Sequence, residues 1–192
     1  MFEYIKGLLV EIAPSNAVVE AGGFGYSLSI SLNTYTAIHN QKEVMLYLHH
    51  IVREDAELLY AFGDKVERDI FRHLISVSGV GPNTARIMLS SLTPAEVVGA
   101  ITTNDLNKIK GVKGIGIKTA QRIIVDLKDK VGSLEGSSAL AGIETTARDE
   151  AVSALITLGF VKSNVEKVVD IILKEVPQSK VEEIIKTALK RL

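Results

Sequence analysis

One segment of the sequence occurs twice, 35 residues apart, and this repeat restricts the possible fold more than any other feature. Residues 74–92 read LISVSGVGPNTARIMLSSL, and they align with residues 109–127, which read IKGVKGIGIKTAQRIIVDL. Each copy has a helical period, then a Gly-apolar-Gly turn, then a second helical period. A repeat of this kind marks a duplicated supersecondary unit, so the middle of the chain is predicted to hold two helical hairpins.

The turn of each copy leads directly into a helix, whose first N–H groups and partial positive charge attract anions. The glycines permit a sharp turn and a close approach to the backbone. The apolar residue between them, Val80 or Ile115, can enter the core. The N–H groups of each turn are therefore predicted to bind phosphate oxygens, with Asn83 beside the first turn and Lys118 beside the second.

The spacing of the glycines excludes the common nucleotide-binding loops. A P-loop has Lys-Ser/Thr directly after its last glycine, whereas Ile117 separates Gly116 from Lys118. A dinucleotide fingerprint follows a strand, whereas both turns follow helical segments. Two tandem turns suit two phosphates of a polymer, bound without base readout and with strong salt dependence. The alternative is that both turns are only tight corners between helices.

The charge of the chain is unevenly distributed, although its net value is −1. Residues 1–63 hold three Lys or Arg against seven Asp or Glu, whereas residues 64–132 hold eleven against seven. Both turns lie in the basic segment. This placement favours a polyanionic ligand for the middle of the chain and opposes one for the N-terminal part.

Periodicity divides the chain into parts that together predict a multidomain α+β protein. Residues 1–63 contain five short β-like runs with one helical interruption, which suits an OB-type β-barrel, or alternatively a plain five-stranded antiparallel sheet. Residues 64–131 are predicted to form an all-α tandem domain. Residues 132–146 are rich in Gly, Ser and Ala and read as a flexible linker, and residues 147–192 suggest three short amphipathic helices.

The sequence gives no support for a membrane span, a signal peptide, a disulfide, a metal site or a catalytic site. No uncharged apolar run approaches 18 residues, and Glu3, Lys6 and Glu11 interrupt the apolar N-terminus, so we expect a cytoplasmic protein without a membrane span or signal peptide. The chain has no cysteine, which removes disulfides and thiolate sites. His49 and His50 would point to opposite faces of a strand. We therefore expect no metal site and no catalytic residue.

These motifs in combination resemble the RuvA family, the Holliday-junction-binding subunits of bacterial RuvAB branch-migration complexes. The resemblance depends on GVGPNTA and GIGIKTA, on HHIVREDAELLYAF in the predicted barrel, and on EAVSALITLGF near the C-terminus. It extends over essentially the whole chain in the same domain order. It implies an OB-fold barrel, a tandem helix-hairpin-helix DNA-binding domain and a C-terminal three-helix, UBA-like domain.

The resemblance also implies an assembly and partners. It implies a homotetramer, single or paired face to face, that holds a four-way DNA junction open during recombination and DNA repair. The C-terminal domain would dock on RuvB, the hexameric ATPase, so ATP and magnesium would be used by RuvB and this chain would bind no cofactor. The RuvC junction resolvase is a further implied partner, and the SOS response is the implied cellular context.

The same resemblance assigns roles to individual residues. The acidic pin at the centre of the tetramer would be Glu54 and Asp55. Asn83 and Ile117 stand where some relatives have lysine, which predicts weaker charge assistance. The surface that meets RuvB would consist of Leu155, Leu158 and Phe160. The contacts to the DNA backbone would be Gly79, Val80, Gly81, Asn83, Gly114, Ile115, Gly116 and Lys118.

Two other functions stay open at the level of the sequence. A helix-hairpin-helix DNA glycosylase or lyase needs a catalytic Asp or Lys in a base-flipping pocket, but Phe71 is the only aromatic residue of the basic segment. A single-strand DNA-binding OB protein needs aromatic residues for stacking, on a barrel whose acidic balance opposes that role. Its candidates are Tyr4, Phe24, Tyr26, Tyr35, Tyr47, Tyr60 and Phe62.

Overall fold

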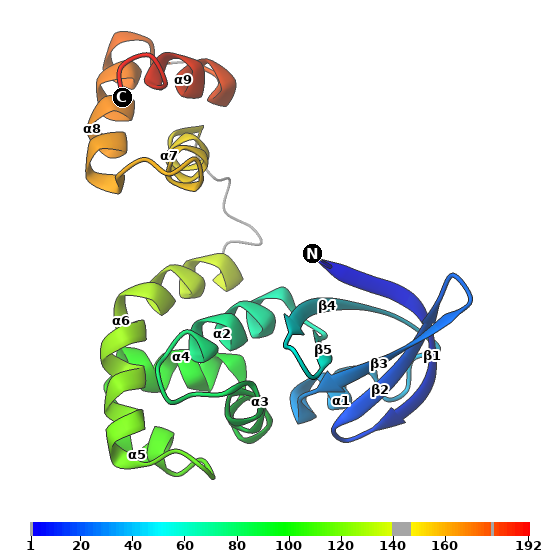
Figure 1. The fold of residues 1–192 in the computed structure, drawn as a ribbon. Helices are drawn as coiled ribbons and strands as arrows, with labels where there is room; N and C mark the ends of the chain where they lie inside the picture. Colours follow the sequence, from blue (N-terminus) through cyan, green and yellow to red (C-terminus); the bar gives the residue numbers. More distant parts are fainter. Residues whose placement is uncertain (1, 140–146, 178) are drawn as a thin grey trace. The chain divides into compact units, whose positions relative to one another are not determined.

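The computed structural model of the chain describes residues 2–139, 147–177 and 179–192. The chain divides into two compact units, Met1–Ser138 and Ala139–Leu192. In the first unit a β-barrel lies beside a group of helices, and the second unit is helical (Figure 1).

Five strands close into a barrel in the order β1-β2-β3-β5-β4. Neighbouring strands are antiparallel except for β3 and β5, which are parallel, and helix α1 (Leu32–Ile38) connects β3 to β4. An irregularity between Leu9 and Glu11 bends β1, so that it pairs with both β4 and β2. The OB-type barrel predicted from the sequence is thereby confirmed. The strands are β1 (Tyr4–Ala13), β2 (Asn16–Ala21), β3 (Phe24–Ile30), β4 (Glu43–Val52) and β5 (Glu57–Phe62).

Two helices of the first unit begin at residues whose side chains accept hydrogen bonds from free backbone N–H groups. Asp64 accepts a hydrogen bond from the N–H of Val66 at the start of α2, and Thr93 and Glu96 form a capping box at the start of α4. The all-α tandem predicted for this region is confirmed. Its helices are α2 (Lys65–Ile75), α3 (Pro82–Ser91), α4 (Pro94–Thr102), α5 (Leu106–Lys110) and α6 (Ile117–Ala139).

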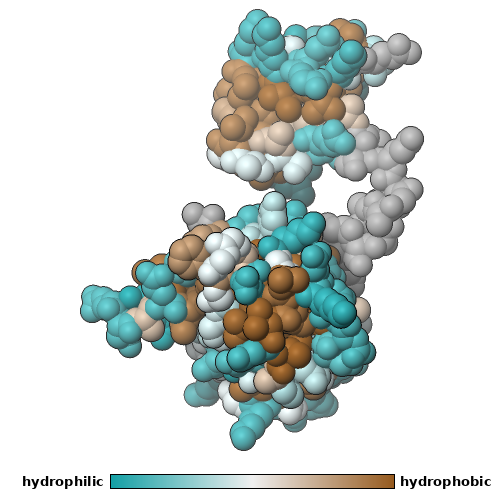
Figure 2. Space-filling model, turned by 90° about the vertical axis from the view of Figure 1, so that its right-hand side faces the viewer, coloured by the Kyte–Doolittle hydropathy of each residue, from teal (hydrophilic) through white to brown (hydrophobic). Residues whose placement is uncertain are grey.

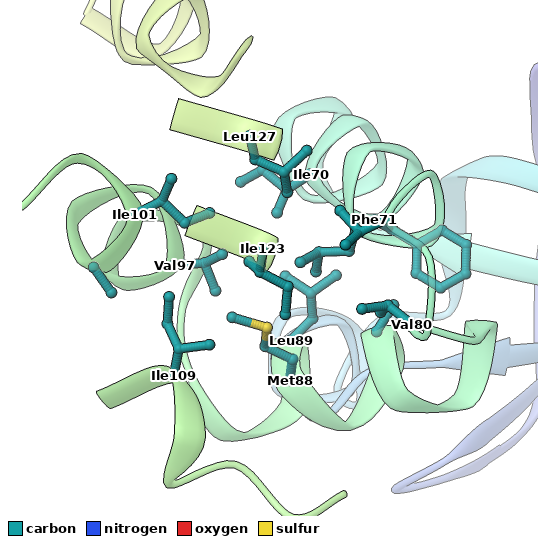
Figure 3. Packing of buried hydrophobic residues seen from close by; sticks show 14 of the residues in the cluster. Ile70, Phe71, Val80, Met88, Leu89, Val97, Ile101, Ile109, Ile123 and Leu127 are labelled. Atoms are coloured by element: carbon teal, nitrogen blue, oxygen red, sulfur yellow. The ribbon is translucent and has the colours of Figure 1, made fainter. Parts of the chain in front are cut away.

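The apolar faces of these helices meet in one core. Ile70, Leu89 and Ile123, which come from three different helices, point toward one another (Figure 3). The same core includes Tyr60 and Phe62 of strand β5, both buried. The barrel and the helices of the first unit are therefore joined by shared apolar packing as well as by the chain.

Helix α6 differs from the prediction at its C-terminal end. The sequence predicted a flexible linker over residues 132–146, but α6 continues to Ala139. Extending a formed helix fixes one residue for each added hydrogen bond, whereas starting one is unfavourable, so a Gly- and Ser-containing stretch can continue a helix that has already formed. Residues 140–146 of the predicted linker lie outside the described residues.

The C-terminal unit contains α7 (Ala147–Thr157), α8 (Lys162–Glu175) and α9 (Val181–Ala188), which confirms the predicted three-helix part. Gly159 has a φ of +99°, and its N–H donates to the carbonyl of Ile156 at 2.9 Å. The N–H of Phe160 donates to the carbonyl of Leu155 at 3.2 Å. These two bonds are those of a Schellman motif, which ends α7 and brings Phe160 back onto Leu155.

Candidate nucleic-acid interface

The two Gly-apolar-Gly turns have closely similar backbone geometry. The first glycine of each turn is left-handed, with a φ of +93° at Gly79 and +90° at Gly114. The N–H of the central apolar residue donates to the carbonyl three residues earlier, at 3.0 Å in the first turn and 3.1 Å in the second. The internal repeat of the sequence is therefore a repeat of structure as well.

The apolar residue of each turn is inserted into the helical core. Val80 and Ile115 are each only 5% exposed. Figure 3 shows Val80 pointing into the cluster that contains Phe71 and Leu89. This confirms that the central residue anchors each turn. It also restricts these two residues to contacts through their main chains, because their side chains cannot reach a ligand.

Each turn ends at the N-terminus of a helix that lacks a side-chain cap. Gly81 is the N-cap residue of α3 and has no side chain that could accept a hydrogen bond. Within residues 2–139, no group accepts a hydrogen bond from the N–H groups of Asn83, Thr84, Lys118 or Thr119. These N–H groups lie in the first turn of a helix, at the positive end of its dipole, which is the arrangement that binds phosphate oxygens.

The second glycine of each turn has room around it. A Cβ atom built at Gly81 or Gly116 would meet no atom within 4 Å. The φ of Gly81 is −82°, a value that any residue adopts. The fold itself therefore does not require glycine at these positions. Close approach of an external group would explain it.

The two turns lie close to each other. Arg122 of α6 donates to the carbonyl of Ser78 in the first turn at 3.1 Å, and a Cβ built at Gly79 would lie 3.9 Å from the hydroxyl of Thr119. Lys118, one helical turn before Arg122, is exposed. The sequence predicted Lys118 but missed Arg122, although a spacing of four residues on one helix could have indicated it.

Three family models match successive parts of the chain. The first, described as RuvA N terminal domain, matches residues 1–61. The second, SAM-like Helix-hairpin-helix tandem, matches residues 71–129, and the third, RuvA, C-terminal domain, matches residues 146–192. The order of these matches is the order of the barrel, the tandem helices and the three C-terminal helices.

Relatives match over the full length of both chains. The protein named Holliday junction branch migration complex subunit RuvA from Bacteroides thetaiotaomicron is 52% identical over 201 residues, covering 100% of each chain. The chain belongs to the RuvA family. Proteins of the same name from Christiangramia forsetii and Flavobacterium psychrophilum are 51% and 46% identical, again over 100% of each chain. The resemblance drawn from the sequence is confirmed.

The residues that the RuvA resemblance assigned to an acidic pin lie at the tip of a hairpin. Glu54 and Asp55 are exposed in the turn between β4 and β5. The turn is closed by the N–H of Arg53, which donates to the carbonyl of Ala56 at 2.9 Å. Below the tip, His50 lies 3.4 Å from Glu57 across the two strands. Both carboxylates therefore project from a hairpin supported by neighbouring pairs.

The RuvB-facing surface suggested by the RuvA resemblance requires one correction. Leu155 is fully buried in the core of the C-terminal unit, so it cannot be part of an exposed surface. It lies one helical turn after Ala151, which is also fully buried, and both belong to a core shared with α8 and α9. Leu158, by contrast, is 60% exposed. The sequence missed the other exposed apolar residues of this unit, which are Ile156, Val161, Ile171, Val176, Leu189 and Leu192.

Other kinds of site receive no support from the described residues. No group of three or more His, Asp or Glu in the described ranges could hold a metal ion. No helix in the described part of the chain is long and apolar enough to cross a membrane. Of the aromatic residues considered for stacking on single strands, Tyr60 and Phe62 are buried in the helical core.

Proposed function

We propose that this chain binds four-way DNA junctions through the sugar-phosphate backbone, without reading sequence, and that it does so as a homotetramer that recruits the RuvB ATPase for branch migration. The main support for this proposal is the pair of equivalent turns. Each turn presents uncapped helix N–H groups beside a glycine that has no atom within 4 Å of its built Cβ position. The printed name of the full-length relatives supports the same junction and the same process.

Two phosphate clamps in one chain suit DNA better than a single nucleotide. Backbone N–H groups recognise phosphate oxygens without regard to the base, so junctions of unrelated sequence should bind equally. Four chains would supply four such pairs, and once one arm is bound the others are presented at high effective concentration. Preference for a four-way junction over linear duplex is the expected consequence.

The outer face of the barrel supports self-association. Apolar side chains gather on the barrel side of the first unit (Figure 2), and a contiguous apolar surface of this kind usually marks a protein interface. The barrel also carries Glu54 and Asp55, so four barrels around one axis would bring their carboxylates together. The exposed large apolar residues of the strands are Tyr4, Leu8, Val10, Phe24, Met45 and Val52.

The carboxylates of Glu54 and Asp55 would then repel phosphates at the crossover and help to separate strands that enter from two arms. Replacing them by Gln and Asn should leave junction binding intact and change branch-migration behaviour. Unchanged migration would remove the pin from the mechanism.

The C-terminal unit would bind RuvB through exposed apolar residues near the end of α7, among them Leu158, which the RuvA resemblance also assigns to this surface. ATP hydrolysis would take place in RuvB, and this chain would act as a non-catalytic subunit.

The experiment measures binding of the full chain to two junctions of unrelated sequence and to linear duplex, at several salt concentrations. We expect equal affinity for both junctions, weaker binding to duplex, and a steep loss of affinity with salt. Gly81→Ala combined with Gly116→Ala should weaken junction binding by about tenfold or more, because a methyl group would hold the phosphate away from the N–H donors.

The matched control is Gly99→Ala, which also adds a methyl group in open space but within helix α4, away from both turns. Its junction affinity should stay within about twofold of the unmodified protein. Equal affinity of the unmodified protein for junction and duplex would contradict the proposed function.

A further inference from the structure

Helix α1 connects the barrel to two helices of the tandem, and its contacts are unusually polar for a buried position. Ile38 at its C-terminal end is part of the barrel core. At its N-terminal end, Ser31 and Thr34 are fully buried and face Glu67 of α2, which is 3% exposed. The barrel thus holds one end of α1, and the helical tandem holds the other.

Two buried hydroxyl groups donate hydrogen bonds to the carboxylate of Glu67. The Thr34 hydroxyl accepts from the N–H of Gly63 at 3.0 Å and donates its own proton to Glu67 at 2.8 Å. The Ser31 hydroxyl accepts from the N–H of Thr34 at 3.0 Å, and it too donates to Glu67. Both carboxylate oxygens are therefore acceptors, and among the described residues no buried side-chain nitrogen or oxygen lacks a partner.

Burial raises the pKa of Glu67, while its bonds to the two hydroxyls lower it. A group of this kind is tolerated in a core only when its partners are correctly placed. The network therefore fixes the distance and the orientation between α1 and α2.

Helix α3 is attached to the barrel at two separate points. Its C-terminal carbonyls, those of Leu89 and Leu92, accept hydrogen bonds from the side-chain amide of Asn33 in α1, and the second bond is 3.0 Å long. Nearer its N-terminus, Arg86 donates to the carbonyl of Ser15 in the turn between β1 and β2, at 2.9 Å. Two attachments along one helix define its direction relative to the barrel, which a single attachment could not do.

The direction of α3 determines where the first turn lies, because Gly81 is the N-cap residue of the same helix. At 1.5 Å per residue, a helix of this length spans about 15 Å, so if the whole helical group tilted by about 10° about the attached end of α3, the first turn would move by about 2.6 Å relative to the barrel. A displacement of that size is comparable to the length of a hydrogen bond, and it is enough to lose one.

We propose that Asn33, Thr34 and Glu67 form a brace that sets the angle between the barrel and the phosphate-binding turns, and that this angle determines the preference for four-way junctions over duplex. The inference rests on the proposed function, because it concerns how four chains present their turns together. Within one chain both turns belong to the same helical group, so binding to a single duplex does not depend on the brace. Simultaneous binding of four arms depends on the brace, because the barrels would set the positions of the four chains.

The test compares Asn33→Ala combined with Thr34→Val against the unmodified full-length chain. Valine keeps the shape of threonine but can neither donate to Glu67 nor accept from Gly63. Alanine removes both side-chain bonds of Asn33 to the end of α3, while the bond from the N–H of Leu32 to the hydroxyl of Ser90 remains. The affinities for a four-way junction and for linear duplex are measured under the same conditions, together with native mass and helical content by circular dichroism. We expect junction affinity to fall at least tenfold, duplex affinity to stay within about twofold, and the oligomeric state to stay unchanged.

The matched control is Thr34→Ser, which keeps the hydroxyl and should keep the preference for junctions. If the double variant folds poorly, the ratio of junction to duplex affinity is measured for Asn33→Ala alone. Asn33 is half-buried, so its replacement should disturb the fold less than that of Thr34. A well-folded variant with an unchanged ratio of junction to duplex affinity would overturn the brace. So would an equal loss of both affinities, which would indicate a role in stability alone. Absence of junction preference in the unmodified chain would instead count against the proposed function.

Discussion

The two glycines of each turn have different structural requirements, and the difference can be measured as stability. Gly79 and Gly114 have φ values of +93° and +90°, whereas the φ of Gly81 is −82°. Built Cβ atoms meet nothing within 4 Å at Gly81, Gly114 and Gly116, and only a hydroxyl at 3.9 Å at Gly79. Backbone conformation is therefore the main difference between first and second positions.

The expected magnitude follows from that difference. A left-handed conformation costs an alanine about 1–2 kcal/mol. The smaller entropy of alanine in the unfolded chain offsets about 0.4–1 kcal/mol of this. Gly79→Ala and Gly114→Ala should each lower the free energy of unfolding by about 1 kcal/mol, which lowers the Tm of a unit of this size by about 3 °C.

Gly81→Ala and Gly116→Ala should behave differently. Alanine is a poorer N-cap residue than glycine, but its reduced unfolded-state entropy acts in the opposite direction. We expect the free energy of unfolding to stay within about 0.5 kcal/mol of the unmodified protein.

The assay is urea unfolding of the full-length chain, followed by circular dichroism, with Gly99→Ala as a control. That substitution lies inside helix α4 and should be stabilising by up to about 1 kcal/mol. Equal stability losses at the first and second glycines would refute the division of roles. So would a first-glycine variant as stable as the unmodified protein.

Three further predictions concern single residues. Hydrogen bonds from Thr93, and then the bond from Lys108, lower the pKa of Glu96 from 4.5 to about 2. The stabilising effect of the Glu96 carboxylate should therefore be complete above pH about 4.5 and be lost toward pH about 2. The free energies of urea unfolding of Glu96→Gln and of the unmodified protein should converge as the pH falls over that range. Asn83→Lys should tighten junction binding and steepen the plot of log K against log salt by up to about 0.9 for each lysine that reaches a phosphate, and an unchanged slope would place position 83 away from the DNA. Leu158→Asp should reduce binding to RuvB in a pull-down without lowering the Tm of the C-terminal unit, because that side chain is 60% exposed; normal RuvB binding would exclude Leu158 from the contact.

Much of the fold could be predicted because local and tertiary preferences agree. The repeat identified both turns, and the apolar residue between the glycines was correctly predicted to enter the core, as Val80 and Ile115 do. The five strands were recognisable from their composition and turn signals, and they close into the predicted barrel. In each of these cases a short segment carries the information that determines its own structure.

Other features depend on contacts that a local pattern does not contain. Leu155 lies in an apolar run that could face outward or inward, and it is buried because it belongs to a core shared with Val169 of α8 and Ile184 of α9. Glu67 reads as an ordinary charged residue on a helix, yet the partners that permit its burial, Ser31 and Thr34, lie more than 30 residues earlier in the chain. The continuation of α6 into a Gly- and Ser-containing stretch likewise depends on the helix that precedes it.

The most direct measurement of the central claim replaces Gly81 and Gly116 by serine. A serine hydroxyl at an N-cap position accepts a hydrogen bond from the second or third N–H of the helix, so it would occupy the donors that we assign to phosphate. Because serine is a better cap, the free energy of unfolding should rise by a few tenths of a kcal/mol or more, while affinity for a four-way junction falls at least tenfold. A more stable protein that still binds the junction as tightly as before would contradict the claim that these N–H groups hold the DNA.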